Sequence, residues 1–251
     1  MAFAARLIEK EAARVGWESL PSDGHLGKMK RTTLIGLISI FSQDPAHVAE
    51  ARRRLDALLA NVDDASTCPT DYRVSVLQMV LRAGGEKEYA DVMRLYDRVR
   101  TEAEKRQIMG SLGHTPLPHL KQRTLDWATS GAVKTQDFFF VLRSVSGSSQ
   151  QGLEQTWRYF KDNFNRIHAM VSSAPSSLMV HAINASCDEF TTDERADEIA
   201  AFFAAHPLPE CSMKIGQLIE TVRVAASWSK RRAASPLADA SFWNLDTLLS
   251  S

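Results

Sequence analysis

The sequence has few cysteines and no pairing pattern among them. Its 251 residues include three, Cys68, Cys187 and Cys211, an odd number without Cys-x-x-Cys spacing. Such a set does not make a disulfide framework and is typical of proteins in a reducing compartment. Asp188 and Glu189 follow Cys187 directly, and their carboxylates would raise the pKa of its thiol. We therefore do not expect a catalytic cysteine.

An excess of charge of either sign is also absent. Lysine plus arginine and aspartate plus glutamate number 30 each, so the formal net charge is zero. Nucleic-acid-binding domains are usually basic, and we predict that nucleic acid is not a partner. Two basic clusters, residues 52–54 and 230–232, fall in or at the end of predicted helices. A solvated helix face is the simpler interpretation of each, and a charged ligand is the alternative.

Long apolar runs are missing as well. No stretch approaches the length of a membrane span, and charged residues at positions 9–11 come too early for the apolar core of a signal peptide. These absences predict a cytoplasmic protein with no membrane partner. The prediction changes if the chain is a piece of a longer protein whose targeting signal lies elsewhere.

The common catalytic signatures do not occur. None of the seven histidines belongs to a His-Glu-x-x-His helix, and His114 and His119 are separated by prolines in a geometry poor for two ligands on one face. There is no Gly-x-Ser-x-Gly, Walker or dinucleotide motif, and residues 147–149 are more typical of a helix–helix turn than of a phosphate cradle. From the residues alone we predict no chemistry of the chain's own. A hydrolase using a Ser/His or Cys/His pair stays open only because those residue types are present.

Helix signals, in contrast, follow one another along the whole chain. Asp23 is a candidate N-cap for a helix to about Phe41, the pair Asp44-Pro45 starts the next, and a capping box from Thr191 to Glu194 precedes a later one. A last short helix is expected over residues 237–249. Roughly a dozen helices joined by short loops indicate an all-α fold. We predict one domain, residues 1–251, built as a right-handed α-solenoid of antiparallel helix pairs of the HEAT or armadillo type.

The stretch 135–171 predicts the most regular packing. We expect a short apolar helix capped by Thr135, a turn that Gly147 and Gly152 allow to close, and one long amphipathic helix. Six apolar residues of that long helix are spaced 4, 3, 4, 3 and 4 apart and share one face: Leu153, Trp157, Phe160, Phe164, Ile167 and Val171. A helix pair cannot bury such a stripe alone, so neighbouring helices must cover it.

Short motifs in a fixed order resemble one protein family. In the second half they are Thr135-Gln136-Asp137, Val145-x-Gly147, Trp157-x-Tyr159-Phe160-Lys161-Asp162-Asn163-Phe164, Phe190-Thr191, Phe202-Phe203-x-x-His206-Pro207 and Ala226-x-Trp228-x-Lys230-Arg231. In the first half they are Val15-Gly16-Trp17-Glu18, Gly24-His25-Leu26, the run 50–54, and Gly113 before Leu117-Pro118. Together they look like the C-terminal helical domain of puromycin-sensitive-type zinc aminopeptidases, a domain that also follows the catalytic unit in the endoplasmic-reticulum aminopeptidases and aminopeptidase N. The resemblance covers essentially the whole chain, and the order of the motifs carries it, because each alone is a packing or capping pattern.

The resemblance implies a helical bowl that closes over a catalytic domain and encloses a cavity for short peptides. Zinc chemistry in that family needs a His-Glu-x-x-His helix, a distant glutamate and a Gly-Ala/x-Met-Glu-Asn strand; neither motif occurs here, so no catalytic or metal residue is carried over. The implied partners are the catalytic domain of the parent chain, which would hold the Zn²⁺, and the peptide substrate.

Arg143 and Arg166 are the candidates for contacts in the peptide cavity, and a solvated outer face is the alternative for both. The competing function is a standalone α-solenoid scaffold that binds a protein or peptide without enzymatic activity.

Overall fold

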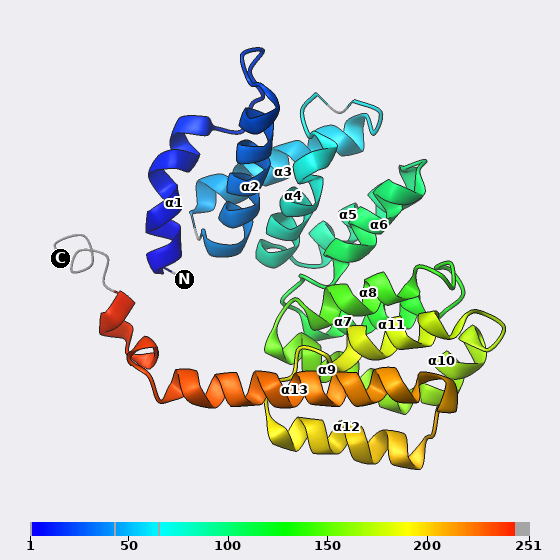
Figure 1. Ribbon diagram of the computed structural model, residues 1–251. Helices are drawn as coiled ribbons and strands as arrows, with labels where there is room; N and C mark the ends of the chain where they lie inside the picture. Colours follow the sequence, from blue (N-terminus) through cyan, green and yellow to red (C-terminus); the bar gives the residue numbers. More distant parts are fainter. Residues whose placement is uncertain (1, 43, 65, 244–251) are drawn as a thin grey trace. The chain divides into compact units, whose positions relative to one another are not determined.

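A computed structural model gives the structure of residues 2–42, 44–64 and 66–243 (Figure 1). Within these ranges the regular structure consists only of α-helices and short 3₁₀ helices, which confirms the all-α prediction. No helix in the same ranges combines the length and the apolar character needed to cross a bilayer. The chain divides into two compact units, residues 1–117 and 118–251. The solenoid arrangement and the single domain stay predictions.

The first unit is built around its fourth helix. Its helices are α1 (Ala2–Val15), α2 (His25–Phe41), α3 (Pro45–Ala60), α4 (Thr70–Ala83), α5 (Glu86–Arg98) and α6 (Glu102–Leu112). Helix α4 packs against α2, α3, α5 and α6, and α1 packs against α2. Apolar side chains of α4 such as Val76, Leu77 and Val80 are fully buried, so this helix forms the centre of the unit's core.

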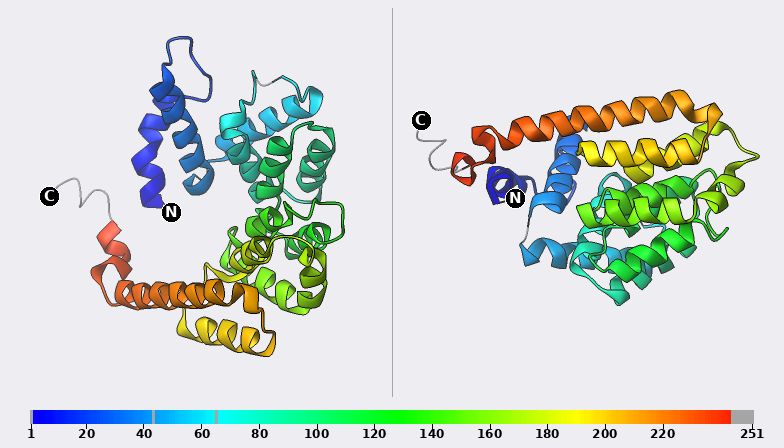
Figure 2. Two further views of the ribbon diagram at one scale, coloured as in Figure 1. Left: turned by 45° about the vertical axis from the view of Figure 1, so that its right-hand side comes forward. Right: turned by 90° about the horizontal axis from the view of Figure 1, so that it is seen from below.

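In the second unit the last two long helices, α12 and α13, pack on the earlier ones through α9 and α11. Its helices are α7 (Pro118–Ala128), α8 (Phe138–Ser146), α9 (Gln150–Asp162), α10 (Phe164–Val171), α11 (Ser176–Cys187), α12 (Asp193–Ala205) and α13 (Ser212–Ala233), with 3₁₀ helices η1 (Pro209–Cys211), η2 (Pro236–Ala238) and η3 (Ala240–Trp243). Helix α8 packs on α7, α9 and α11. The long helix α13 lies beside α12 (Figures 1 and 2) and also contacts α11.

The structure confirms one predicted helix N-cap and corrects two others. Pro45 is the first residue of α3, and the Asp44 carboxylate accepts a hydrogen bond from the Ala46 amide at 2.8 Å, as predicted. Asp23 does not cap α2, whose N-cap is Gly24, because its carboxylate instead binds the Leu20 amide and the Arg31 guanidinium. Helix α12 is capped one residue later than predicted, by Thr192, which accepts from the Arg195 amide.

The apolar stripe of the stretch 135–171 is buried as predicted, but the helices that carry it differ from the predicted ones. All six stripe residues are at most 8% exposed. The predicted long helix is divided at Asn163, whose φ of −110° and ψ of 15° leave the helical region and whose side-chain amide donates to the Tyr159 carbonyl. Thr135 is not the cap of α8 either, since Asp137 occupies that position.

The predicted last helix over residues 237–249 is wrong in the part that the structure describes. That part consists of the two 3₁₀ turns η2 and η3, which reach only to Trp243. Residues 244–249 lie outside the described ranges. Pro236 follows Ser235 at the first position of η2, and it cannot continue α13 because proline lacks the N–H that helix propagation requires.

Gly152 lets α8 and α9 approach each other closely. A Cβ atom built at this position would lie 2.1 Å from the carbonyl oxygen of Val145 on α8. Because a backbone atom cannot yield as a flexible side chain does, Gly152→Ala should lower the free energy of unfolding by about 1–3 kcal/mol. Urea denaturation measures this, with Gly216→Ala on α13 as the matched control. A Cβ at Gly216 meets nothing within 4 Å, so the control should be neutral or stabilising by about 0.5–1 kcal/mol. Equal destabilisation of both variants would contradict the close approach.

Candidate functional site

Arg143 lies in the last turn of α8 and ties it to the end of α11. Its guanidinium donates to both carboxylate oxygens of Asp188 at 2.6 Å and to Glu189 at 3.2 Å. The hydrogen bonds that Arg143 donates to Asp188 hold the pKa of Arg143 above its ordinary value. This two-point pairing is the strong form of an arginine–carboxylate interaction, and it already engages the donors that a peptide would need. A peptide contact of Arg143 stays a prediction.

Arg166 is exposed on α10 and lies beside a polar hollow. It donates to the hydroxyls of Thr129 and of Tyr159, two buried residues. Tyr159 also lines a hollow of about 350 Å³ whose other walls come from α7, α9 and Asn163. The lining residues are Pro118, Gln122, Gln151, Glu154, Gln155, Arg158, Tyr159, Asp162 and Asn163. The partners of Arg143 and Arg166 are different, so the structure does not join the two arginines into one site.

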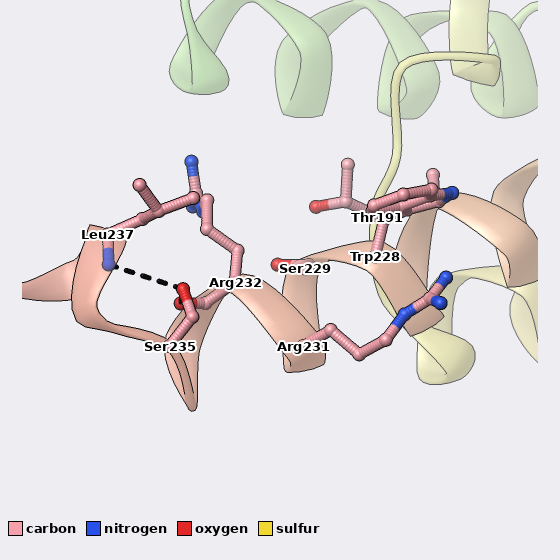
Figure 3. Close-up of a pocket in the computed structure, with 8 residues that line it drawn as sticks. Thr191, Trp228, Ser229, Arg231, Arg232, Ser235 and Leu237 are labelled. Carbon is pink, nitrogen blue, oxygen red and sulfur yellow. Dashed lines mark hydrogen bonds between the residues drawn. The ribbon is translucent and has the colours of Figure 1, made fainter.

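A larger groove lies at the C-terminal end of α13 (Figure 3), and we call it the α13 groove. It has a volume of about 680 Å³ and is lined by Thr191, Ala225, Trp228, Ser229, Arg231, Arg232, Ser235 and Leu237. The Trp228 side chain is 63% exposed, and the guanidinium carbon of Arg231 lies 4.2 Å from its ring centroid. The groove thus combines an open indole, an aliphatic wall and two arginines without a carboxylate in its lining.

The α13 groove exists because the last turns of α13 extend past its core contacts. The buried residues of this helix are Ile215, Leu218, Val222 and Ala226, and no buried residue follows. The chain turns at Ser235, whose hydroxyl accepts from the Leu237 amide at 3.3 Å, and Leu237 lines the groove from beyond the end of the helix (Figure 3). Sequence reasoning singled out Trp228 only as part of a family motif. A tryptophan next to three basic residues beyond the apolar stripe was the signal that could have indicated the groove.

One member of a basic cluster is buried, which corrects the prediction of a solvated face. Arg52 and Arg53 are exposed, but Arg54 is fully buried. Its guanidinium donates to Glu50 at 2.8 Å, to Glu18 at 2.5 Å and to the Thr67 carbonyl. It also lies 5.1 Å from the Trp17 ring centroid. Arg54 therefore holds the loops before α2 and α4 against α3 and is not a free ligand-binding group.

The three cysteines are free and buried, and burial raises the pKa of each thiol, that of Cys68 to about 11. At Cys187 the Asp188 carboxylate adds to the effect of burial in raising the pKa. Very little thiolate is present at neutral pH, so none is a reactive nucleophile. We expect a disulfide reagent at pH 7.5 to leave native protein nearly unlabelled, and to label all three thiols in guanidinium chloride. Fast labelling of one native thiol would contradict this.

The sequence comparisons identify the family. A sequence model of the ERAP1-like C-terminal domain matches residues 1–224. The chain belongs to this family. It is 29% identical to Aminopeptidase M1 of Arabidopsis thaliana over 90% of the chain and 25% of that protein. It is 25% identical to Aminopeptidase 2, mitochondrial, of Saccharomyces cerevisiae over 91% of the chain and 24% of that protein. It is 24% identical to the puromycin-sensitive aminopeptidase of Caenorhabditis elegans over 62% of the chain and 17% of that protein.

This ERAP1-like C-terminal domain spans about a quarter of the length of the first of these relatives and matches their C-terminal part. The resemblance predicted from the ordered motifs is confirmed. Within the described ranges, no group of three or more His, Cys, Asp or Glu side chains could hold a metal ion, so this part of the chain does not fit a zinc site. Arg143 and Arg166 lie inside the matched residues, whereas all of the α13 groove except Thr191 lies beyond residue 224.

Proposed function

We propose that this chain is the non-catalytic C-terminal domain of a zinc aminopeptidase. Its role is to cap the active-site cavity and to help select and bind peptides while the parent enzyme removes N-terminal amino acids. The observation that carries the proposal is the family match over residues 1–224, together with relatives that are named as aminopeptidases. The Zn²⁺ of the reaction belongs, in this proposal, to the catalytic domain of the parent protein.

The proposed partner within the parent protein is that catalytic domain. Exposed large apolar side chains support a docking role. In the first unit they are Leu7, Leu20, Leu26, Met29 and Ile40. Interfaces between domains of one chain are partly apolar, and such residues are costly to leave in water when they cluster. Cytoplasmic location remains part of the proposal, although one yeast relative is designated mitochondrial.

For the peptide, Arg166 is the better placed of the two predicted arginines. It is exposed beside the polar hollow, and its two protein partners are neutral hydroxyls of Thr129 and Tyr159. A peptide carboxylate would give it a charge-assisted hydrogen bond that these hydroxyls do not supply. Arg143, in contrast, would have to leave Asp188 and Glu189 to bind a peptide.

The first test is the coding sequence upstream of Met1. A His-Glu-x-x-His motif there supports the aminopeptidase, and a native gene that starts at Met1 favours the standalone scaffold. In the encoded aminopeptidase, Arg166→Ala should raise the KM for long peptides about tenfold, the effect of losing one hydrogen bond to a charged group. It should leave the hydrolysis of a single-residue aminoacyl reporter unchanged.

Arg223→Ala is the matched control, because Arg223 is an exposed arginine on α13 that pairs with Asp197. It should change neither KM. If Arg166→Ala leaves the KM for long peptides unchanged, Arg166 does not contact the peptide. If it impairs the reporter equally, the substitution acts on the enzyme's stability or chemistry instead.

A further inference from the structure

We propose that the α13 groove binds an amphiphilic anion, a small molecule whose apolar body packs against Trp228 and Leu237 and whose carboxylate or sulfonate pairs with Arg232. Apart from Thr191, the residues that line the groove lie beyond the part of the chain that the family model matches. The proposal therefore goes beyond the domain's proposed role in an aminopeptidase, and it does not rest on that role.

The α13 groove has the size and the open apolar wall of a small-molecule site. Its volume of about 680 Å³ lies within the range of about 300–1,000 Å³ that is usual for ligand pockets. Trp228 is 63% exposed and Leu237 is 44% exposed, although both side chains are large and apolar. Arg231 lies on the indole, with 4.2 Å between its guanidinium carbon and the ring centroid, and the rest of the side chain stays open. A ligand with an apolar body would remove this surface from water.

The charge in the groove is positive, and carboxylates of the described residues do not neutralise it. Lys230, a neighbouring basic residue of α13, is paired with Asp193 of α12 at 2.5 Å. Arg231 and Arg232, in contrast, form no ion pair with a described residue. No carboxylate is present among the described residues that line the groove. The groove therefore favours an anionic ligand over a cationic one.

The helix dipole alone does not account for this arrangement. Basic side chains at the C-terminal end of a helix usually complement its partial negative charge, which is about half a unit. That partial charge opposes the binding of an anion, but it is smaller than the two full positive charges of Arg231 and Arg232. The dipole also gives no reason for the indole of Trp228 to face solvent beside them.

One ligand can reach both the apolar and the polar groups of the groove. Trp228 and Arg232 are four residues apart and therefore lie on the same face of α13. Leu237 lines the groove from beyond the end of this helix (Figure 3). The hydroxyls of Thr191 and Ser229 also line it and form no hydrogen bond with a described residue, so both can donate to an anion.

Two fluorescent probes that share one aromatic body test the site in the full 251-residue chain. The anionic probe is 8-anilinonaphthalene-1-sulfonate. The neutral probe is N-phenyl-1-naphthylamine, which has the same aromatic rings and lacks the sulfonate. Fluorescence titration should show saturable binding of the anionic probe to the native protein. Absence of saturable binding would overturn the proposal.

Two substitutions separate the charge from the apolar wall. Arg232→Gln should raise the Kd of the anionic probe about tenfold and leave the Kd of the neutral probe unchanged, because only the sulfonate pairs with the guanidinium. Trp228→Ala should raise the Kd of both probes about tenfold, because both pack against the indole. An equal effect of Arg232→Gln on the two probes, or no effect of Trp228→Ala, would overturn the proposal.

Arg223→Gln and Met213→Ala are the matched controls on the same helix. Arg223 is an exposed arginine outside the groove lining, and Met213 is a 67% exposed apolar residue in the first turn of α13. Neither substitution should change the Kd of either probe. Because the side chains at all four substituted positions are exposed, the variants should keep the helix content of the native protein, which circular dichroism measures.

Two further outcomes would contradict the site. If Arg223→Gln weakens the anionic probe as much as Arg232→Gln does, the probe responds to the general charge of α13 and not to the groove. If the apparent Kd rises with protein concentration, a second copy of the chain occupies the groove. Either result would overturn the proposal.

Discussion

Replacement of Trp157 by alanine should lower the free energy of unfolding by about 3–5 kcal/mol, the range for removal of a large buried aromatic side chain. Trp157 is 1% exposed and packs between α9 and α12. Its ring lies 5.9 Å from that of Phe160, nearly parallel, and 5.4 Å from that of Phe202, edge to face. The indole N–H donates to a carboxylate oxygen of Glu198 at 3.0 Å, so alanine leaves both a cavity and a lost hydrogen bond.

Urea denaturation followed by circular dichroism gives this value, with Arg158→Ala as the matched control. Arg158 is the next residue on α9, and its side chain is on the exposed side of the helix. We expect the control to change stability by no more than about 0.5 kcal/mol. A Trp157→Ala variant as stable as the Arg158→Ala variant would show that the indole is not in the core.

Replacement of Arg54 by alanine should destabilise the protein by about 3 kcal/mol, the lower end of the cost of breaking a buried ion pair. The lower end applies because Glu18 is largely exposed and can be solvated when Arg54 is absent. The Thr67 carbonyl and the Tyr72 hydroxyl, which Arg54 contacts at 3.2 Å, lose a donor in a buried position. Packing against Trp17 is lost at the same time.

Arg53→Ala is the control for this prediction. Arg53 is the neighbouring residue, is 54% exposed and pairs with the same Glu50 at 2.8 Å. Exposed pairs contribute about 0–1 kcal/mol, so this variant should be close to wild type. Arg54→Lys should fall between the two, because lysine keeps the charge but lacks the planar fork of donors. Comparable effects of Arg53→Ala and Arg54→Ala would show that the cluster acts as a solvated surface after all.

Periodicity predicted the core of the stretch 135–171 well and its breaks poorly. The apolar spacing continues unchanged from Phe160 to Phe164, so nothing in the pattern indicates that Asn163 ends one helix and precedes the next. Cap prediction worked at Asp44, where Pro45 restricts the backbone locally. It failed at Asp23, because Arg31, eight residues later, binds the carboxylate that would have capped α2. Tertiary partners of this kind are not visible in a local motif.

The buried arginine could have been predicted, whereas the α13 groove could be predicted only in part. Ala51, Arg54, Leu55 and Leu58 follow the i, i+3, i+4, i+7 pattern of one helix face, and all four are buried. The groove depends on the turn after α13 that brings Leu237 into its lining, and no periodic pattern encodes this turn.

Zinc content and aminopeptidase turnover of the purified chain test the central claim most directly. As a non-catalytic domain it should bind no stoichiometric zinc after dialysis against excess metal, and it should not hydrolyse an aminoacyl reporter substrate above the rate of a buffer blank. Stoichiometric zinc with turnover that a chelator abolishes and added zinc restores would contradict the claim, because the catalytic site would then lie in this chain.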